Sequence, residues 1–247
     1  MSRERHIPGA DAVDSVEGNT NGRENSGGSG FRRSSKSEGA EAVTRRDEIG
    51  DAEQWPIASR DPASGGPSQY ARITAALGTR SVVLVGMMGA GKSTIGRRLS
   101  ARLRLPFRDA DTEIERAHAM TIPEMFASHG ERYFRDGEAQ AIARLLDNGP
   151  SVLATGGGAL TREETRNRIR NQAVSIWLKA DPDIIASRVK HRSDRPLLLT
   201  VDPELTVKHL MADREPFYQQ ADLTIRSRDV PYETIVDECI EGLHARL

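Results

Sequence analysis

The chain has 247 residues, with 35 lysines and arginines against 36 aspartates and glutamates, and a formal net charge of −1. This balance disfavours nucleic-acid binding, since domains that bind DNA or RNA usually carry a strong basic bias. The single cysteine excludes an intramolecular disulfide framework and a cysteine-based zinc site. Because the sequence has no run of about 18 apolar residues, we expect no membrane-spanning helix, and we expect a cytoplasmic monomer.

Residues 1–70 differ in composition from the rest of the chain. They contain no leucine, and they hold 10 of the 22 glycines. A segment of this kind cannot bury enough apolar surface to offset the entropy that a chain loses on folding. We therefore predict a disordered N-terminal extension over 1–70 and one folded domain over 71–247.

Beyond the extension, short apolar runs alternate with amphipathic segments. Because the apolar runs have few polar positions, they are typical of strands that are buried on both faces of a sheet. The alternation predicts an α/β protein of three layers, with helices on both faces of a five-stranded parallel sheet. We expect strands at 81–85, 105–108, 151–154, 173–178 and 222–225, and helices at 71–77, 92–103, 112–118, 121–147, 161–170, 182–190, 203–219 and 231–246.

The first predicted strand leads directly into Gly86-Met-Met-Gly-Ala-Gly-Lys-Ser-Thr94, which has the spacing of the phosphate-binding P-loop. Glycines allow backbone N–H groups to converge on phosphates, and the N-terminus of the following helix adds its positive dipole end. Lys92 should reach the β- and γ-phosphates, and Ser93 should bind Mg²⁺. The Asn-Lys-x-Asp sequence by which GTPases recognise guanine is absent. The residues expected to contact the nucleotide here are Gly89, Ala90, Gly91, Lys92, Ser93 and Thr94.

Two carboxylates, Asp109 and Asp111, follow the second predicted strand. Residues at positions i and i+2 of a strand point the same way, so both side chains can face the phosphates. One carboxylate would suit the magnesium ion and the other an acceptor hydroxyl, as phosphoryl transfer requires. The alternative is that the pair caps the next helix. After the third predicted strand, Gly156, Gly157 and Gly158 should let another group approach the backbone closely.

In order and spacing, these motifs resemble the shikimate kinase family over about residues 80–247. The resemblance also rests on Gly130-Glu-Arg-Tyr-Phe-Arg135, Arg195-Pro-Leu-Leu198 and Arg214-Glu-Pro-Phe-Tyr218. It implies ATP-dependent phosphorylation of the 3-hydroxyl of shikimate, with Mg²⁺ as cofactor, in aromatic amino acid biosynthesis. It also implies a lid that closes over ATP. The other hypotheses are a kinase for a different hydroxy acid, such as gluconate, and a nucleotide-binding module without catalysis.

The resemblance assigns roles to individual residues. Arg135 and Arg214 would bind the carboxylate of shikimate, with Glu138 orienting Arg135 and with Phe126 and Phe134 lining the pocket. Which residue near Arg228–Pro231 contacts adenine is left open, because Asp229 stands where the family often has arginine or glutamine. The implied catalytic residues are Lys92, Asp111 and Arg195, the metal ligands Ser93 and Asp109, the further ATP contacts Arg188 and Arg195, and the substrate contacts Asp111, Arg135, Gly156, Gly157, Gly158 and Arg214.

Overall fold

A computed structural model of the chain describes residues 67–189 and 202–247. The predicted lid with Arg195, and nearly all of the predicted N-terminal extension, lie outside the described residues. Within those two ranges no helix is long and apolar enough to cross a membrane.

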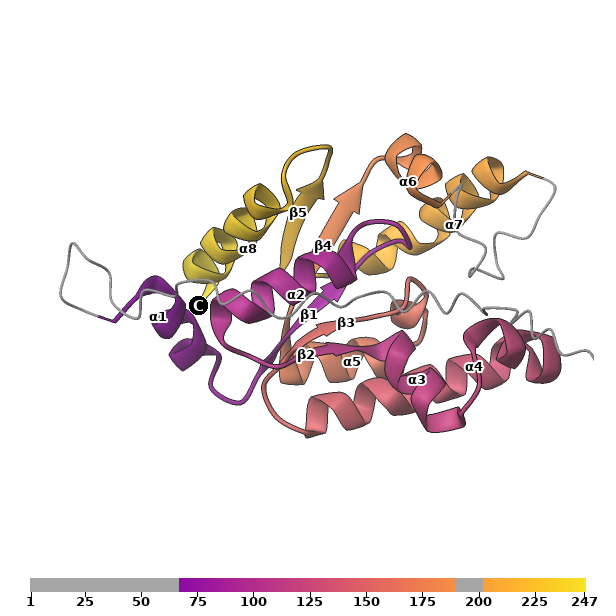
Figure 1. Cartoon of the computed structure of the whole chain (residues 1–247), viewed down its shortest axis with the longest axis horizontal. Helices are drawn as coiled ribbons and strands as arrows, with labels where there is room; N and C mark the ends of the chain where they lie inside the picture. Colours follow the sequence, from indigo (N-terminus) through magenta and orange to yellow (C-terminus); the bar gives the residue numbers. More distant parts are fainter. Residues whose placement is uncertain (1–66, 190–201) are drawn as a thin grey trace, which may run out of the picture. The chain divides into compact units, whose positions relative to one another are not determined.

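Five strands form one parallel sheet in the order β2-β3-β1-β4-β5 (Figure 1). The central strand β1 pairs with both neighbours, since Val83 lies opposite Leu153 of β3 and Ser175 of β4. All five residues of β1 are buried, as expected for an apolar run inside a parallel sheet. The predicted five-stranded parallel sheet is therefore confirmed. Its strands are β1 (Ser81–Val85), β2 (Phe107–Asp109), β3 (Val152–Ala154), β4 (Ala173–Ala180) and β5 (Leu223–Ser227).

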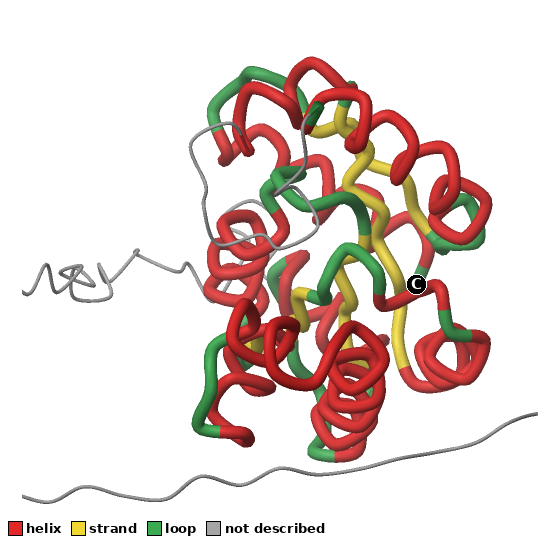
Figure 2. Tube along the Cα trace, turned by 90° about the vertical axis from the view of Figure 1, so that its right-hand side faces the viewer, coloured by secondary structure: helices red, strands yellow, loops and turns green. Residues whose placement is uncertain are grey.

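Helices cover both faces of the sheet (Figures 1 and 2), which confirms the three predicted layers. Helix α2 packs against α1 and α8, whereas α4 packs against α3 and α5, and α7 against α6. The helices are α1 (Gln69–Leu77), α2 (Lys92–Leu103), α3 (Ala110–His118), α4 (Ile122–Asp147), α5 (Glu163–Gln172), α6 (Pro182–Val189), α7 (Pro203–Tyr218) and α8 (Tyr232–Arg246), with a short 3₁₀ turn, η1, at Ala159–Thr161.

Helix α4 begins at a capping box and is kinked near its middle. Thr121 accepts a hydrogen bond from the backbone N–H of Glu124, and the Glu124 carboxylate accepts one from the N–H of Thr121. Gly130 interrupts the helix with φ 79° and ψ 173°, a conformation that favours glycine. The kink separates 122–129 from 131–147, and the second segment carries the charged residues of the site described next.

Candidate active site

The loop between β1 and α2 depends on glycine for its shape. Gly86, Gly89 and Gly91 have φ values of 134°, 80° and 93°, all in the range that other residues rarely adopt. At Gly86 a Cβ atom would also lie 2.7 Å from the carbonyl oxygen of Leu178 on β4. The predicted P-loop therefore has both the strand–loop–helix context and the backbone conformation that this motif needs.

The side chain of Lys92 points back into this loop. Lys92 is the first residue of α2 and is largely buried, and its Nζ donates to the carbonyl oxygens of Gly86 and Met87, at 2.8 Å each. The ammonium group is thus held at the carboxyl end of β1, against the loop that would surround a phosphate.

Ser93 and Asp109 meet at the start of α3. Ser93 Oγ donates to Asp109 Oδ2 at 2.7 Å, while Asp109 Oδ1 accepts from the backbone N–H of Asp111 at 3.1 Å. Asp109 is therefore the N-cap of α3 and also a neighbour of the phosphate loop, so the two readings of this carboxylate are compatible. The hydroxyl and carboxylate oxygens suit Mg²⁺, which uses one or two carboxylates together with substrate phosphates and water. The described residues contain no cluster of three or more His, Cys, Asp or Glu that could hold a metal ion.

A cavity of about 250 Å³, here called the loop cavity, opens beside the phosphate loop. Arg188 of α6 borders it and donates from Nη1 to the Gly89 carbonyl oxygen and to Ser227 Oγ, at 3.2 Å each. The lining residues are Met88, Gly89, Gly91, Lys92, Ser93, Thr94, Asp109, Asp111, Thr155, Gly156, Gly157, Arg188 and Tyr232.

A smaller pocket of about 40 Å³, here called the arginine pocket, adjoins the loop cavity. The two spaces share Met88, Asp111, Gly156 and Gly157, so the Asp111 side chain lies where they meet. A group bound in one space can therefore reach a group bound in the other at this carboxylate. The lining residues of the arginine pocket are Met88, Asp111, Ile122, Phe126, Phe134, Arg135, Glu138, Gly156, Gly157, Gly158 and Arg214.

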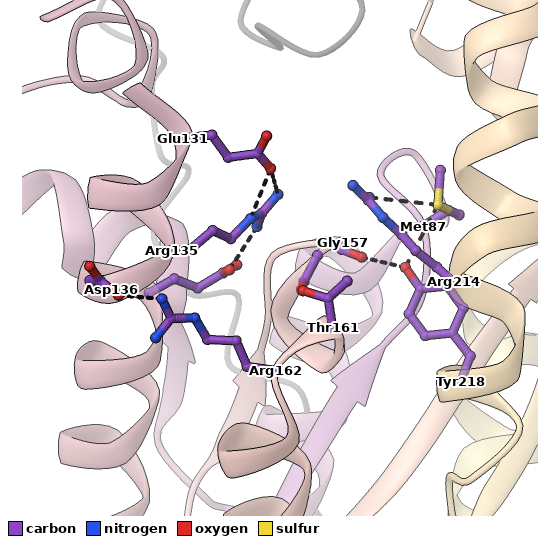
Figure 3. A network of polar contacts seen from close by, with 11 residues as sticks. Met87, Glu131, Arg135, Asp136, Gly157, Thr161, Arg162, Arg214 and Tyr218 are labelled. Carbon is purple, nitrogen blue, oxygen red and sulfur yellow. Dashed lines mark hydrogen bonds and ion pairs between the residues drawn. The ribbon is translucent and has the colours of Figure 1, made fainter. Parts of the chain in front are cut away.

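Two carboxylates hold Arg135 in place (Figure 3). Its Nη1 donates to Glu138 Oε2 at 2.7 Å, and its Nε and Nη2 donate to Glu131 Oε1 at 3.2 and 3.0 Å. Burial lowers the pKa of Arg135, but the two ion pairs more than offset this and leave the pKa above its ordinary value. Burial raises the pKa of Glu138, against the opposing effect of Arg135, and the nearby Asp111 raises it further. Glu138 therefore orients Arg135 as predicted, and Glu131 is a second partner that sequence reasoning missed.

Arg214 reaches the same pocket from α7. It is 6% exposed, and its Nη1 lies 4.0 Å from the sulfur of Met87 in the phosphate loop (Figure 3). On the next turn of α7, Tyr218 donates its hydroxyl to the Gly157 carbonyl oxygen and also contacts Met87 Sδ at 3.6 Å. Burial raises the pKa of Tyr218 to about 12, although the neighbouring Arg214 opposes the shift. This cluster joins α7, the phosphate loop and the three glycines.

Charged side chains of the chain itself approach the three glycines. A Cβ atom at Gly156 would collide with Glu138 Oε1 and would lie 3.1 Å from Asp111 Oδ1. A Cβ atom at Gly157 would lie 3.4 Å from Arg214 Nη1, and one at Gly158 would overlap the guanidinium of Arg135. The sequence indicated a close approach at this turn, and the structure identifies which groups make it.

The structure thus brings together all the predicted site residues that fall within the described ranges. Asp111, Arg135, Arg214 and the three glycines surround the arginine pocket, and the phosphate-loop residues, Asp109 and Arg188 surround the loop cavity or form its loop. Phe126 and Phe134 pack together with ring centroids 5.0 Å apart and line the arginine pocket, as predicted. Tyr232, which lines the loop cavity, was missed because no motif marks it.

Comparison with known proteins identifies the family of this chain. Residues 88–244 match the family model described as SKI: Shikimate kinase. The shikimate kinase of Bradyrhizobium diazoefficiens is 69% identical over 180 residues, which cover 73% of this chain and 87% of that protein. A solved structure, the shikimate kinase from Acinetobacter baumannii in complex with shikimate, matches with a TM-score of 0.67 and 33% identity over 70% of this chain and 97% of that one. The chain therefore belongs to the shikimate kinase family.

Proposed function

We propose that this chain transfers the γ-phosphoryl group of ATP to the 3-hydroxyl of shikimate, giving shikimate 3-phosphate and ADP. One observation carries the proposal: a phosphate-loop cavity and a pocket bordered by two arginines meet at the carboxylate of Asp111. Phosphoryl transfer needs the acceptor oxygen and the phosphorus held in line, with little covalent chemistry from the protein. Two adjoining spaces that share a carboxylate would suit that arrangement.

On the acceptor side, Arg135 and Arg214 would bind the carboxylate of shikimate. A guanidinium group binds a carboxylate through two parallel hydrogen bonds, which fixes the orientation of the ring as well as its position. Glu131 and Glu138 limit the freedom of Arg135 before substrate arrives, so less entropy is lost on binding. Asp111 would then orient the 3-hydroxyl toward the phosphate and accept its proton.

On the nucleotide side, Lys92 would exchange its contacts with the Gly86 and Met87 carbonyl oxygens for the β- and γ-phosphates. Ser93 and Asp109 would hold Mg²⁺, which neutralises phosphate charge when it is bound. Arg195, which lies outside the described residues, would add positive charge to the transferred group when the lid closes.

The proposed catalytic unit is the predicted domain over 71–247, extended to Gln69 because α1 begins there, with the residues before it as an extension. We also propose that the domain is active as a monomer. Gel filtration coupled to light scattering tests the monomer, and deletion of 1–66 tests the extension. If the extension is dispensable, turnover and melting temperature stay unchanged after its removal.

The function is tested by ADP release from Mg·ATP with shikimate, with gluconate and without acceptor. We expect turnover with shikimate alone, and turnover with gluconate but not shikimate would overturn the proposal. Lys92→Ala should stay folded but lose turnover, because its charge is directed at the phosphates. Lys208→Ala is a matched control, since Lys208 is exposed and pairs with Glu204 on the surface of α7.

A further inference from the structure

The loop cavity has two kinds of lining. Most of its residues are small or charged and belong to the phosphate loop or to the boundary with the arginine pocket. Arg188 and Tyr232 belong to neither the phosphate loop nor that boundary, and each presents a flat group to the loop cavity. A purine base is flat and largely apolar on its faces, so it needs surfaces of this kind rather than phosphate ligands.

Tyr232 is held in a defined position at the first turn of α8. The guanidinium carbon of Arg98 lies 4.9 Å from the centre of its ring. Arg98 is itself fixed, because its Nη1 donates to the Thr94 carbonyl oxygen at 3.3 Å and its Nε to Glu233 Oε1 at 3.1 Å. Tyr232 is nevertheless 40% exposed, which leaves ring surface for a ligand to cover. The phosphate-loop helix thus supports the tyrosine from one side.

The resemblance left open which residue near Arg228–Pro231 contacts adenine, and Arg228 itself is engaged elsewhere. Arg228 donates to Arg226 O and, through both Nη atoms, to the Glu238 carboxylate, and it does not line the loop cavity. Its hydrogen bonds with Glu238 raise the pKa of Arg228, as expected for a well-formed ion pair. In the segment that follows β5, which ends at Ser227, Tyr232 is the residue that borders the loop cavity.

We infer that Tyr232 contacts the base of the nucleotide, with its phenol ring as one flat surface and the Arg188 guanidinium as another. This inference rests on the proposed use of ATP, and it assigns to Tyr232 part of the selection for a purine over a bare polyphosphate. Stacking of a base on an aromatic side chain is expected to strengthen binding about tenfold.

The test compares ADP with inorganic tripolyphosphate by calorimetry in the presence of MgCl₂. Tyr232→Ala should bind ADP about tenfold more weakly than the wild type and bind tripolyphosphate with unchanged affinity. Tyr232→Phe should bind both ligands with wild-type affinity. Tyr133→Ala is the matched control, since Tyr133 is also 40% exposed but lines neither space, and it should leave ADP affinity unchanged.

Three results would overturn the inference. Tyr232→Ala could leave the affinity for ADP unchanged, or it could lower the affinities for ADP and tripolyphosphate equally. In the third, Tyr232→Phe would lose as much affinity for ADP as Tyr232→Ala. Equal weakening would mean that the tyrosine acts through the phosphate loop rather than on the base. A wild-type protein that binds ADP but does not phosphorylate shikimate would contradict the proposed function and leave this inference standing.

Discussion

The guanidinium of Arg135 lies against the backbone of Gly158 so closely that a methyl group at this glycine would overlap it. Gly158 has φ −102° and ψ 0°, which alanine can adopt without strain, so Gly158→Ala changes the space and not the backbone. We expect the variant to displace Arg135 and to raise the KM for shikimate at least tenfold, because a charge-assisted hydrogen bond contributes about 1.5–3 kcal/mol.

The nucleotide Kd should stay close to that of the wild type, since Gly158 lines the arginine pocket and not the loop cavity. Gly242→Ala on α8 is the control, because a Cβ atom there would meet only the side-chain tips of Leu223 and Ile225. Unchanged shikimate kinetics in Gly158→Ala would show that Arg135 does not bind the acceptor from the observed position.

Arg135→Lys tests the geometry of the carboxylate contact. Lysine keeps the positive charge but loses the planar set of donors through which Arg135 contacts Glu131 and Glu138. We expect kcat/KM for shikimate to fall about 10- to 100-fold, which corresponds to the loss of one charge-assisted interaction. The measurement pairs steady-state kinetics in shikimate with nucleotide Kd in its absence. If nucleotide affinity falls while acceptor affinity holds, Arg135 is a phosphate ligand instead.

The sequence was sufficient for the parts of the fold that depend on local patterns. The strand at 81–85 and the helix at 92–103 have the predicted limits, because an apolar run, a glycine-rich loop and an amphipathic segment follow one another without a break. The boundaries moved where a cap or a tight turn decides them. Helix α3 begins at Ala110 rather than at residue 112, since Asp109 caps it, and a 3₁₀ turn at Ala159–Thr161 delays α5.

Long-range contacts explain what the sequence did not predict. Tyr232 borders the loop cavity because α8 returns beside α2, which is a property of the whole fold. The motif context did predict the family, and the comparisons confirm it.

Tyr218→Phe tests a buried hydroxyl that supports the glycine turn. Phenylalanine keeps the ring contact with Trp177 but loses the hydrogen bond to the Gly157 carbonyl oxygen, which should cost about 1 kcal/mol of unfolding free energy. Because folding raises the pKa of Tyr218 from 10.0 to about 12, the stabilisation is fully present below pH 10 and is lost as the pH rises toward 12.

In urea unfolding, the wild type should therefore have a higher unfolding free energy than Tyr218→Phe. We expect this difference to be constant from pH 7 to about pH 10 and to shrink between pH 10 and pH 11. A difference that stays constant through pH 11 would contradict the raised pKa. Tyr133→Phe serves as the control, because this tyrosine is 40% exposed.

Asp222→Asn tests how the edge of the sheet is held. Asp222 Oδ2 accepts hydrogen bonds from the backbone N–H and the hydroxyl of Ser175, at 2.9 and 2.8 Å, and Oδ1 accepts one from Arg246 at 3.0 Å. Burial raises the pKa of Asp222, but these hydrogen bonds outweigh it and hold the pKa below its ordinary value of 3.8. The carboxylate therefore ties the start of β4, the start of β5 and the end of α8 together.

A lowered pKa in the folded state means that the stabilisation is present above the unfolded-state pKa and is lost as the pH falls below about 4. We expect Asp222→Asn to lower the unfolding free energy by about 1 kcal/mol at pH 7, a modest value because the side chain is partly exposed to solvent. The difference in unfolding free energy between the wild type and Asp222→Asn should become smaller as the pH of the urea titration is lowered from 7. The lowest useful pH is the one at which the wild type still unfolds cooperatively. Glu241→Gln, which changes an exposed carboxylate on α8, is the control variant. A gap between Asp222→Asn and the wild type that is independent of pH would mean that the asparagine acts through packing, and that the charge of Asp222 does not stabilise the sheet edge.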